Sequence, residues 1–196
     1  SRRSEGAFAA RVGVKKSYPE NKLIKLLGDI SSSVGMNKEA SGTGISQLVE
    51  ADEKQHKYVF SGDFSGDGTS VYLAVLDAKS GELLFKSKSI KTEERFQSLN
   101  LEFSKAGAFR AALLSEGTDT LSVFIADNIS LKNDGGSEML KNGNMEIPNM
   151  LQPYAWDSSG AAFVFMNGDY RAASPEIKKK YLPNAEGWFK MLDRPY

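Results

Sequence analysis

Alternating apolar and polar residues run through the middle of the chain, from residue 57 to residue 131. This stretch contains six segments with the length and composition of β-strands, separated by clusters of Gly, Asp, Ser and Lys. The segments are Lys57–Phe64, Ser70–Asp77, Leu83–Ile90, Arg95–Phe103, Ala108–Ser115 and Leu121–Leu131. Because they follow one another without an intervening helix, a parallel α/β sheet is excluded. Two facing antiparallel sheets would bury the apolar side of each strand, so the pattern predicts an all-β antiparallel sandwich.

The segments before residue 57 predict two further strands and a helix. Ala7–Val14 and Ile45–Val49 have strand composition, and the latter should lie at a sheet edge. Between them, a short helix near residues 20–33 has Pro19 in its first turn and its apolar residues on one face. We expect this amphipathic helix to rest on the sandwich; the alternative is a helix that binds a partner.

The alternating pattern weakens after residue 131. Lys132–Glu138 is rich in turn-forming residues, and Ala161–Met166 is typical of a strand. Ser174–Leu182 begins with a Ser-Pro-Glu sequence that favours a short helix. We therefore expect a sandwich over residues 1–150 and an irregular, aromatic-rich C-terminal extension over residues 151–196.

Composition narrows the possible partners. The 196 residues include 25 acidic and 25 basic ones, with no run of Lys or Arg interleaved with aromatics, which disfavours nucleic-acid binding. The chain has no cysteine, so disulfides, thiolate metal sites and thiol nucleophiles are excluded. No apolar run approaches the roughly 18 residues of a membrane span. The first residues lack the apolar stretch of a signal peptide, although a cleaved signal would leave the same sequence.

Three stretches of the chain carry a family resemblance: Glu5–Val12, Tyr58–Leu76 and Ala108–Leu131. The first stretch combines Gly, aromatic, Ala, Arg and aliphatic residues, the middle one has the pattern of a central hairpin, and the last ends in an Asp-x-aliphatic-Ser-Leu strand. In this order they resemble the family-4/9 type carbohydrate-binding modules, which are jelly-roll β-sandwiches of the galactose-binding-like group. The resemblance implies a non-catalytic module that binds glycans.

One motif of these modules is displaced in this chain. A segment of the type Asn-Gly-Asp-aromatic-Glu opens the modules, whereas the similar Leu140–Pro148 (LKNGNMEIP) comes after the last strand here. Either Asn142 begins a second module, for which too few residues remain, or the opening strand is permuted to the end or swapped into a neighbouring copy. We favour permutation or swapping, and we expect Met145–Ile147 to pair in the same sandwich as Leu121–Leu131.

The resemblance also implies a structural calcium ion. In these modules an Asp of the last strand and a Glu of the opening strand help to hold calcium, and Asp127 and Glu146 stand at those places. The alternative is that Asp127 faces solvent or a neighbouring strand and that Glu146 is merely exposed. Asp63–Gly68 is superficially similar to a calcium loop, but Ala74 stands where a bidentate Glu is needed. That stretch predicts a hairpin turn whose glycines adopt positive φ.

The sequence offers little for catalysis. His56, the single histidine, lies in a polar run before a strand, where a solvated side chain is expected. No serine has the context of a nucleophile elbow, and among 25 acidic residues some carboxylate pairs lie close by chance. We therefore expect that the protein is not an enzyme.

Aromatic side chains are better candidates for a binding site. Tyr154, Trp156, Tyr181 and Trp188 lie in the C-terminal extension, and flat aromatic faces bind both sugar rings and partner surfaces. Small and polar residues flank Tyr154 and Trp156, which favours an exposed turn and makes this pair the expected sugar platform. The alternative is that a tryptophan closes the end of the core.

Together these features predict a non-catalytic binding module that attaches to a glycan or to a larger assembly. The alternative is a structural virion protein, such as a phage head decoration or tail accessory protein. Either one would act outside the cell or on a virion surface, without nucleic acid or membrane, and would self-associate or assemble through the C-terminal extension. A lone glycan module should instead be monomeric, so solution size separates the two functions.

Overall fold

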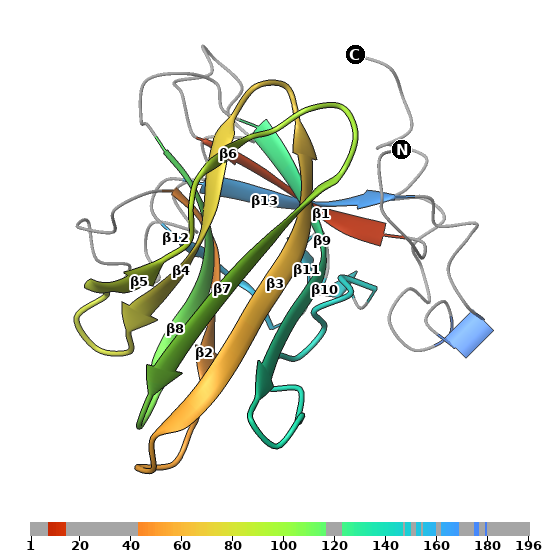
Figure 1. Cartoon of the computed structure of the whole chain (residues 1–196). Helices are drawn as coiled ribbons and strands as arrows, with labels where there is room; N and C mark the ends of the chain where they lie inside the picture. Colours follow the sequence, from red (N-terminus) through yellow and green to blue (C-terminus); the bar gives the residue numbers. More distant parts are fainter. Residues whose placement is uncertain are drawn as a thin grey trace.

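Two antiparallel sheets packed face to face form the protein (Figure 1). The computed structural model describes residues 8–14, 43–116, 123–146, 148–149, 152–153, 155–159, 162–168, 175–176 and 179. The all-β antiparallel sandwich predicted from the alternating pattern is confirmed. The helix expected near residues 20–33 lies outside the described residues, and none of the described helical residues forms a helix long and apolar enough to cross a membrane.

Sheet I has five strands in the order β13-β1-β9-β3-β7. Their bounds are Ala162–Gly168 for β13, Phe8–Val14 for β1, Val123–Asn133 for β9, His56–Gly66 for β3 and Gln97–Lys105 for β7. Strand β13 pairs with β1 from Ala162 opposite Val14 to Gly168 opposite Phe8. The segment expected to be an irregular extension therefore contributes an edge strand to this sheet.

Sheet II has the order β12-β2-β8-β4-β5, and β6 also pairs with β4. The bounds are Asp157–Ser159 for β12, Thr43–Val49 for β2, Phe109–Ser115 for β8, Ser70–Asp77 for β4, Leu83–Lys86 for β5 and Ile90–Lys91 for β6. Strand β2, expected at an edge, is covered by β12 along Gly44–Ser46. A small separate hairpin joins β10 (Pro148–Asn149) to β11 (Gln152–Pro153).

One predicted strand is divided in the structure. The sequence indicates a single strand over Leu83–Ile90, but β5 ends at Lys86 and β6 begins at Ile90. Ser87 causes the break, because its N–H donates to the carbonyl oxygen of Leu73 and its Oγ accepts from the N–H of Leu73. These two bonds fold the chain back onto β4 instead of continuing the ladder.

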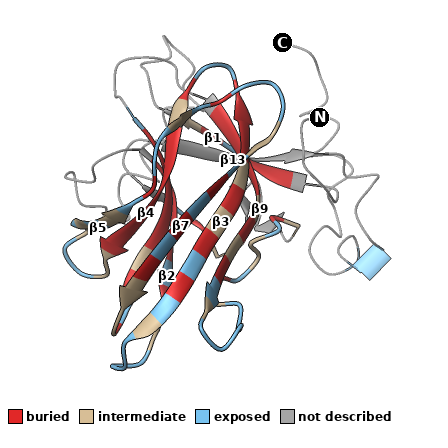
Figure 2. Ribbon diagram, viewed as in Figure 1, coloured by how far each residue is buried: buried red, intermediate tan, exposed pale blue. Residues whose placement is uncertain are grey.

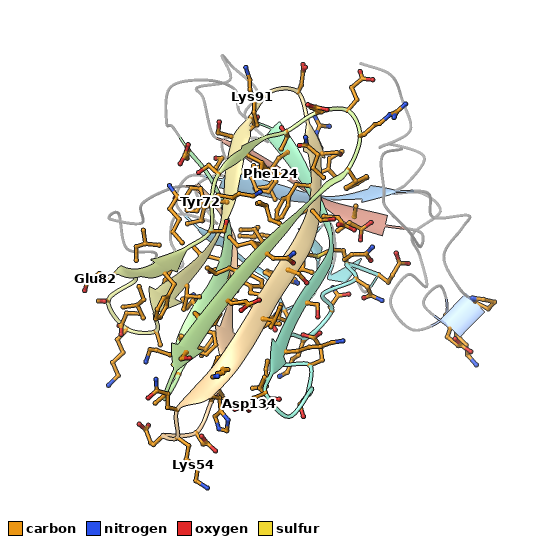
Figure 3. All side chains as sticks on the ribbon, viewed as in Figure 1. Lys54, Tyr72, Glu82, Lys91, Phe124 and Asp134 are labelled. Atoms are coloured by element: carbon orange, nitrogen blue, oxygen red, sulfur yellow. The ribbon has the colours of Figure 1, made fainter. Side chains whose placement is uncertain are left out.

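The core fills the space between the sheets, where alternate residues of each strand meet (Figure 2). Aromatic rings from three strands pack against one another here. The Tyr58 ring stacks on Phe103 with centroids 5.1 Å apart and meets Phe109 edge-on at 5.2 Å. Phe124 lies inside the sandwich (Figure 3) and is fully buried. Burial of such a side chain contributes about 1.5–3 kcal/mol to folding.

The outer face of sheet II is also apolar and buried. Tyr72 and Ala74 of β4 and Ala112 and Leu114 of β8 form a second cluster in which every side chain is 0% exposed. The Lys86 Nζ lies 4.0 Å from the centroid of the Tyr72 ring. Burial, together with the nearby charge of Glu116, raises the pKa of Tyr72 to about 12. This face is therefore covered over β4 and β8, whereas Leu48 of β2 on the same side is 43% exposed.

Residues 138–146 run beside the C-terminal half of β9. The N–H of Ile129 donates to the carbonyl oxygen of Gly143 at 2.8 Å, and the side chain of Met145 is fully buried in the core. A Cβ at Gly143 would clash with the carbonyl oxygen of Ile129, so this close approach requires glycine. The displaced motif thus contacts β9 within one chain through Gly143, whereas Met145 belongs to no described strand and Ile147 lies outside the described residues, so the pairing expected for Met145–Ile147 stays a prediction.

The Asp63–Gly68 stretch is the end of β3 and the turn that follows it. Gly68 has a φ of 82°, as the predicted hairpin turn requires. Gly66, in contrast, still pairs with Phe124 as the last residue of β3. Strand β3 therefore continues two residues beyond the predicted end at Phe64, and the positive φ expected at Gly66 is wrong.

Candidate functional site

The outward face of sheet I carries a strip of polar side chains. Alternate residues of a strand face away from the core, and on β3, β7 and β9 many of these outward residues are Ser, Asn or Asp. We define the polar strip as Ser61, Asp63, Ser98, Asn100, Asn128 and Ser130, all of which are half-buried or exposed. The strip crosses three neighbouring strands, because Ser61 stands opposite both Asn100 and Ser130.

An irregularity in the pairing of β3 with β9 positions the centre of the strip. The register shifts immediately before Asp63, so that Asp63 stands opposite Asp127. The next residue, Asn128, has a left-handed φ of 51°. Gly62 at the shift leaves room for the end of the Ile129 side chain, since a Cβ there would meet Ile129 Cδ1 and displace it. Bulges and left-handed non-glycine residues re-aim side chains and concentrate near functional sites.

Asp63 is the centre of the hydrogen bonds within the strip. The Ser98 Oγ donates to Asp63 Oδ1 at 2.6 Å, and the Asn128 Nδ2 donates to Asp63 Oδ2 at 3.1 Å. Residues from the strands on both sides of β3 therefore fix the orientation of this carboxylate. Asn100 is exposed on the same face and offers a carboxamide donor and acceptor beside it.

Glu138 anchors the chain at the side of the strip. Its Oε2 accepts from the Ser130 Oγ at 2.6 Å, and its Oε1 accepts from the N–H groups of Leu131 at 2.9 Å and Leu140 at 3.1 Å. Both carboxylate oxygens are thus engaged in holding residues 138–140 against β9. We assign Glu138 a structural role.

His56 links two loops at one end of the sandwich. Its Nδ1 lies 3.1 Å from Asp134 Oδ1 and its Nε2 lies 3.0 Å from Asp52 Oδ1. The pKa of His56 is raised mainly by its hydrogen bond to Asp134 and secondly by its hydrogen bond to Asp52. The bond between His56 and Asp134 also lowers the pKa of Asp134. The solvated histidine expected from the sequence is in fact clamped between two carboxylates. Figure 3 shows Asp134 and Lys54 at this end and Lys91 at the other.

The two carboxylates expected to hold calcium lie on segments that meet. Asp127 is two residues before Ile129, and Glu146 is three residues after Gly143, to which Ile129 is hydrogen-bonded. Asp127 is fully buried, and its Oδ1 accepts from the N–H of Asn128 at 2.9 Å. Glu146 is half-buried.

Asp127 and Glu146 are suited to calcium only if backbone carbonyl oxygens complete its coordination. No group of three or more His, Asp or Glu side chains suited to a metal occurs within the part of the chain that the structure describes. Calcium accepts backbone carbonyl oxygens as readily as carboxylates. Asp127 and Glu146 would then supply the charge, and the calcium site stays a prediction.

Trp156 is a core residue. Its side chain is 4% exposed, it belongs to the cluster between the sheets, and its Nε1 donates to the carbonyl oxygen of Asn142 at 3.1 Å. A turn is formed at Ala155, which has a φ of 67°, but the Trp156 side chain is buried rather than exposed, because β12 begins at Asp157 and returns to β2. An indole ring buried in this way has no free face for a sugar. The other expected aromatic contacts, Tyr154, Tyr181 and Trp188, lie outside the described residues and stay predictions.

The sequence interpretation missed the polar strip. A usable signal exists in the polar residues at every second position of the segments around Asp63 and Asn100. Only the strand register, however, places Ser98 and Asn128 on either side of Asp63. The left-handed Asn128 has no signature beyond the general tolerance of asparagine for that conformation.

Comparisons with known proteins agree with the architecture. No family model matches the sequence, and no curated protein matches it. The chain is similar to a solved carbohydrate-binding module (CBM), described as "PbXyn10C CBM APO", with a TM-score of 0.55 and 11% identity over 87% of this chain and 94% of that one. At this identity the match shows the fold alone, a CBM-like two-sheet sandwich.

Two further solved structures are more distant. The "EclA C-terminal domain; sugar-binding protein" has a TM-score of 0.37 and 13% identity over 50% of this chain and 71% of that one. A family 35 carbohydrate binding module from an environmental isolate has a TM-score of 0.28 and 15% identity over 71% of this chain and 90% of that one. Both TM-scores are too low to support the assignment of the fold.

Proposed function

We propose that this protein is a non-catalytic glycan-binding module whose ligand lies along the polar strip. The observation that supports this most is the likeness to a CBM structure over 87% of the chain. The strip supplies a matching surface, because its side chains are half-buried or exposed while the apolar cluster on the outer face of sheet II is buried.

The strip offers groups that suit sugar hydroxyls. A hydroxyl both donates and accepts, so a pair of neighbouring hydroxyls is matched by a carboxylate that accepts and a carboxamide that does both. Asp63 and Asn100 provide these groups, and Ser98 and Asn128 hold Asp63 in one orientation. A fixed side chain loses little rotamer entropy when a ligand binds. Asp63 is the one charged member of the polar strip, and its carboxylate favours neutral over anionic glycans at the centre of the strip.

The proposal is tested by alanine variants of the strip. Glycan-array screening of neutral and anionic polysaccharides, followed by calorimetry on the best ligand, should show binding by the native chain. Asp63→Ala and Asn100→Ala should each raise Kd by about tenfold or more, since a hydrogen bond to a charged or fixed partner is lost. Glu82→Ala is the matched control, because this exposed residue follows β4 in the opposite sheet (Figure 3).

The outcomes separate the function from the site. Absence of binding to any glycan on the array would refute the function. If both strip variants bind the glycan with native affinity, the ligand binds elsewhere on the protein and the proposed function still holds. A glycan ligand implies an extracellular site of action, which we include in the proposal. No observation favours the alternative of a virion structural protein.

A further inference from the structure

Strand β7 ends sheet I with a long and regular edge. It spans nine residues, and each of them pairs with β3, from Gln97 opposite Phe64 to Lys105 opposite His56, without a bulge. Within the described ranges, no strand or loop pairs with its outward side. Its N–H and C=O groups on that side form a template for another strand.

The edges of sheet II differ from β7 in ways that prevent pairing. Strand β5 has four residues and an irregular register against β4, and β12 has three residues. Short or bulged edges of this kind are how soluble proteins avoid edge-to-edge association. Strand β7 has no proline and no glycine, and the middle of its inward side is apolar, with Leu99, Leu101 and Phe103 between Gln97 at one end and Lys105 at the other. The other edge of sheet I is β13, which has seven residues, so β7 is the longest edge among the described strands.

We propose that a second copy of this chain docks on β7, with the two β7 strands antiparallel about a two-fold axis at Leu101. The opposed residues of the two copies would be Glu102 with Asn100, Ser98 with Ser104, and Gln97 with Lys105. No pair brings like charges together, and pairs of this kind stabilise a sheet. On the core side, Leu101 and Phe103 are 9% and 7% exposed, and the added strand covers this remainder. Such an interface is isologous and closes as a dimer.

The dimer would join two copies of sheet I into one continuous sheet. If the proposed glycan function holds, both polar strips then face the same side, and a polysaccharide that spans them binds with avidity. The pairing itself does not depend on the glycan function, and because a glycan module paired through β7 is a dimer, solution size alone then no longer separates that function from an assembly protein. The dimer is therefore tested without any ligand, so that the dimer and the glycan-binding function can be refuted separately.

Sedimentation equilibrium of the full chain over a range of concentrations tests the edge. The native chain should dimerise. Asn100→Glu should raise the dimer dissociation constant at least about fivefold, because the new carboxylate of each copy then lies opposite Glu102 of the other. The double variant Asn100→Glu/Glu102→Lys should restore dimerisation, since the opposed residues become Glu and Lys. Leu48→Glu adds the same charge to β2 at a residue that is 43% exposed, and should dimerise like the native chain.

Each result decides the proposal. A native chain that stays monomeric at every concentration overturns it, as does an Asn100→Glu variant that dimerises normally. Dissociation by Asn100→Glu without rescue in the double variant overturns the register centred on Leu101. Circular dichroism of each variant confirms that it is folded, and Glu102→Lys alone, which should dimerise, serves as the second probe if Asn100→Glu does not fold.

Discussion

Replacing Trp156 with alanine tests where the core ends. The indole ring lies between the sheets at 4% exposure, and its Nε1 holds the carbonyl oxygen of Asn142. The next residue, Asp157, begins β12 and forms an ion pair with Arg110 at 2.6 Å. The ring therefore connects the displaced motif, the core and the first strand of the C-terminal segment in sheet II.

The expected magnitude follows from these contacts. Truncation of a buried tryptophan to alanine costs about 3–5 kcal/mol. The lost hydrogen bond is a small part, about 1 kcal/mol, since the Asn142 carbonyl oxygen also accepts from the N–H of Met145 at 3.1 Å. Trp156→Phe keeps most of the apolar area and loses only that bond and some volume, so it should cost about 1–2 kcal/mol. In a chain of this size, Trp156→Ala should lower Tm by about 6–20 °C.

Urea unfolding followed by circular dichroism measures these differences, provided the slope m is unchanged between variants. Val59→Ala is the control, because Val59 is 48% exposed on β3 and its loss should cost little. A Trp156→Ala protein within about 1 kcal/mol of the native free energy of unfolding would refute the core assignment. If that stable variant also lost glycan binding, Trp156 would be the sugar platform that its sequence context suggests.

Three further results are expected. Because the pKa of His56 is raised, the stabilisation from its bonds to Asp52 and Asp134 is fully present below the ordinary pKa of 6.5 and is lost as pH rises through the higher folded-state pKa. The difference in the free energy of unfolding between the native chain and His56→Gln should therefore shrink above pH 6.5, and a difference that does not change with pH would contradict this. Gly143→Ala should destabilise the fold by at least about 2 kcal/mol in urea unfolding because its Cβ meets a backbone carbonyl of β9, whereas Gly135→Ala meets only the end of a side chain and should have little effect. If Asp127 and Glu146 hold calcium, millimolar calcium should raise Tm above its value in chelator, and equal midpoints would remove the metal.

The positions of most strands could be predicted because each has one buried side. On β7, buried Leu99, Leu101 and Phe103 alternate with exposed or half-buried residues, and this period of two is visible in the sequence. Strand β4 has the predicted bounds Ser70–Asp77, although it is buried on both sides. Its length and flanking turn residues were sufficient signals there.

Contacts between distant segments could not be predicted in the same way. The break at Ser87 depends on a hydroxyl that meets the backbone of Leu73, and the clamp on His56 depends on Asp134, 78 residues away. The burial of Trp156 depends on the return of β12 to sheet II. Each of these tertiary contacts overrides a local preference that the sequence shows correctly. The small neighbours of Trp156 do favour a turn, and the polar run around His56 does favour exposure.

The contrast between the two outer faces supports the choice of the polar strip over any other surface of the sandwich. A sheet face must either be covered or carry polar residues. The outer face of sheet II is covered at Tyr72 and Leu114, which are 0% exposed. Sheet I carries polar residues on its outer face, and on its central strands Asp63 is hydrogen-bonded to Ser98 and Asn128. Asp63 is held by these two neighbours although an exposed carboxylate needs no partner for the stability of the fold. An ordered carboxylate at a bulge on this open face is the feature that the proposed ligand site needs, and for this reason we propose the ligand site on sheet I rather than on sheet II.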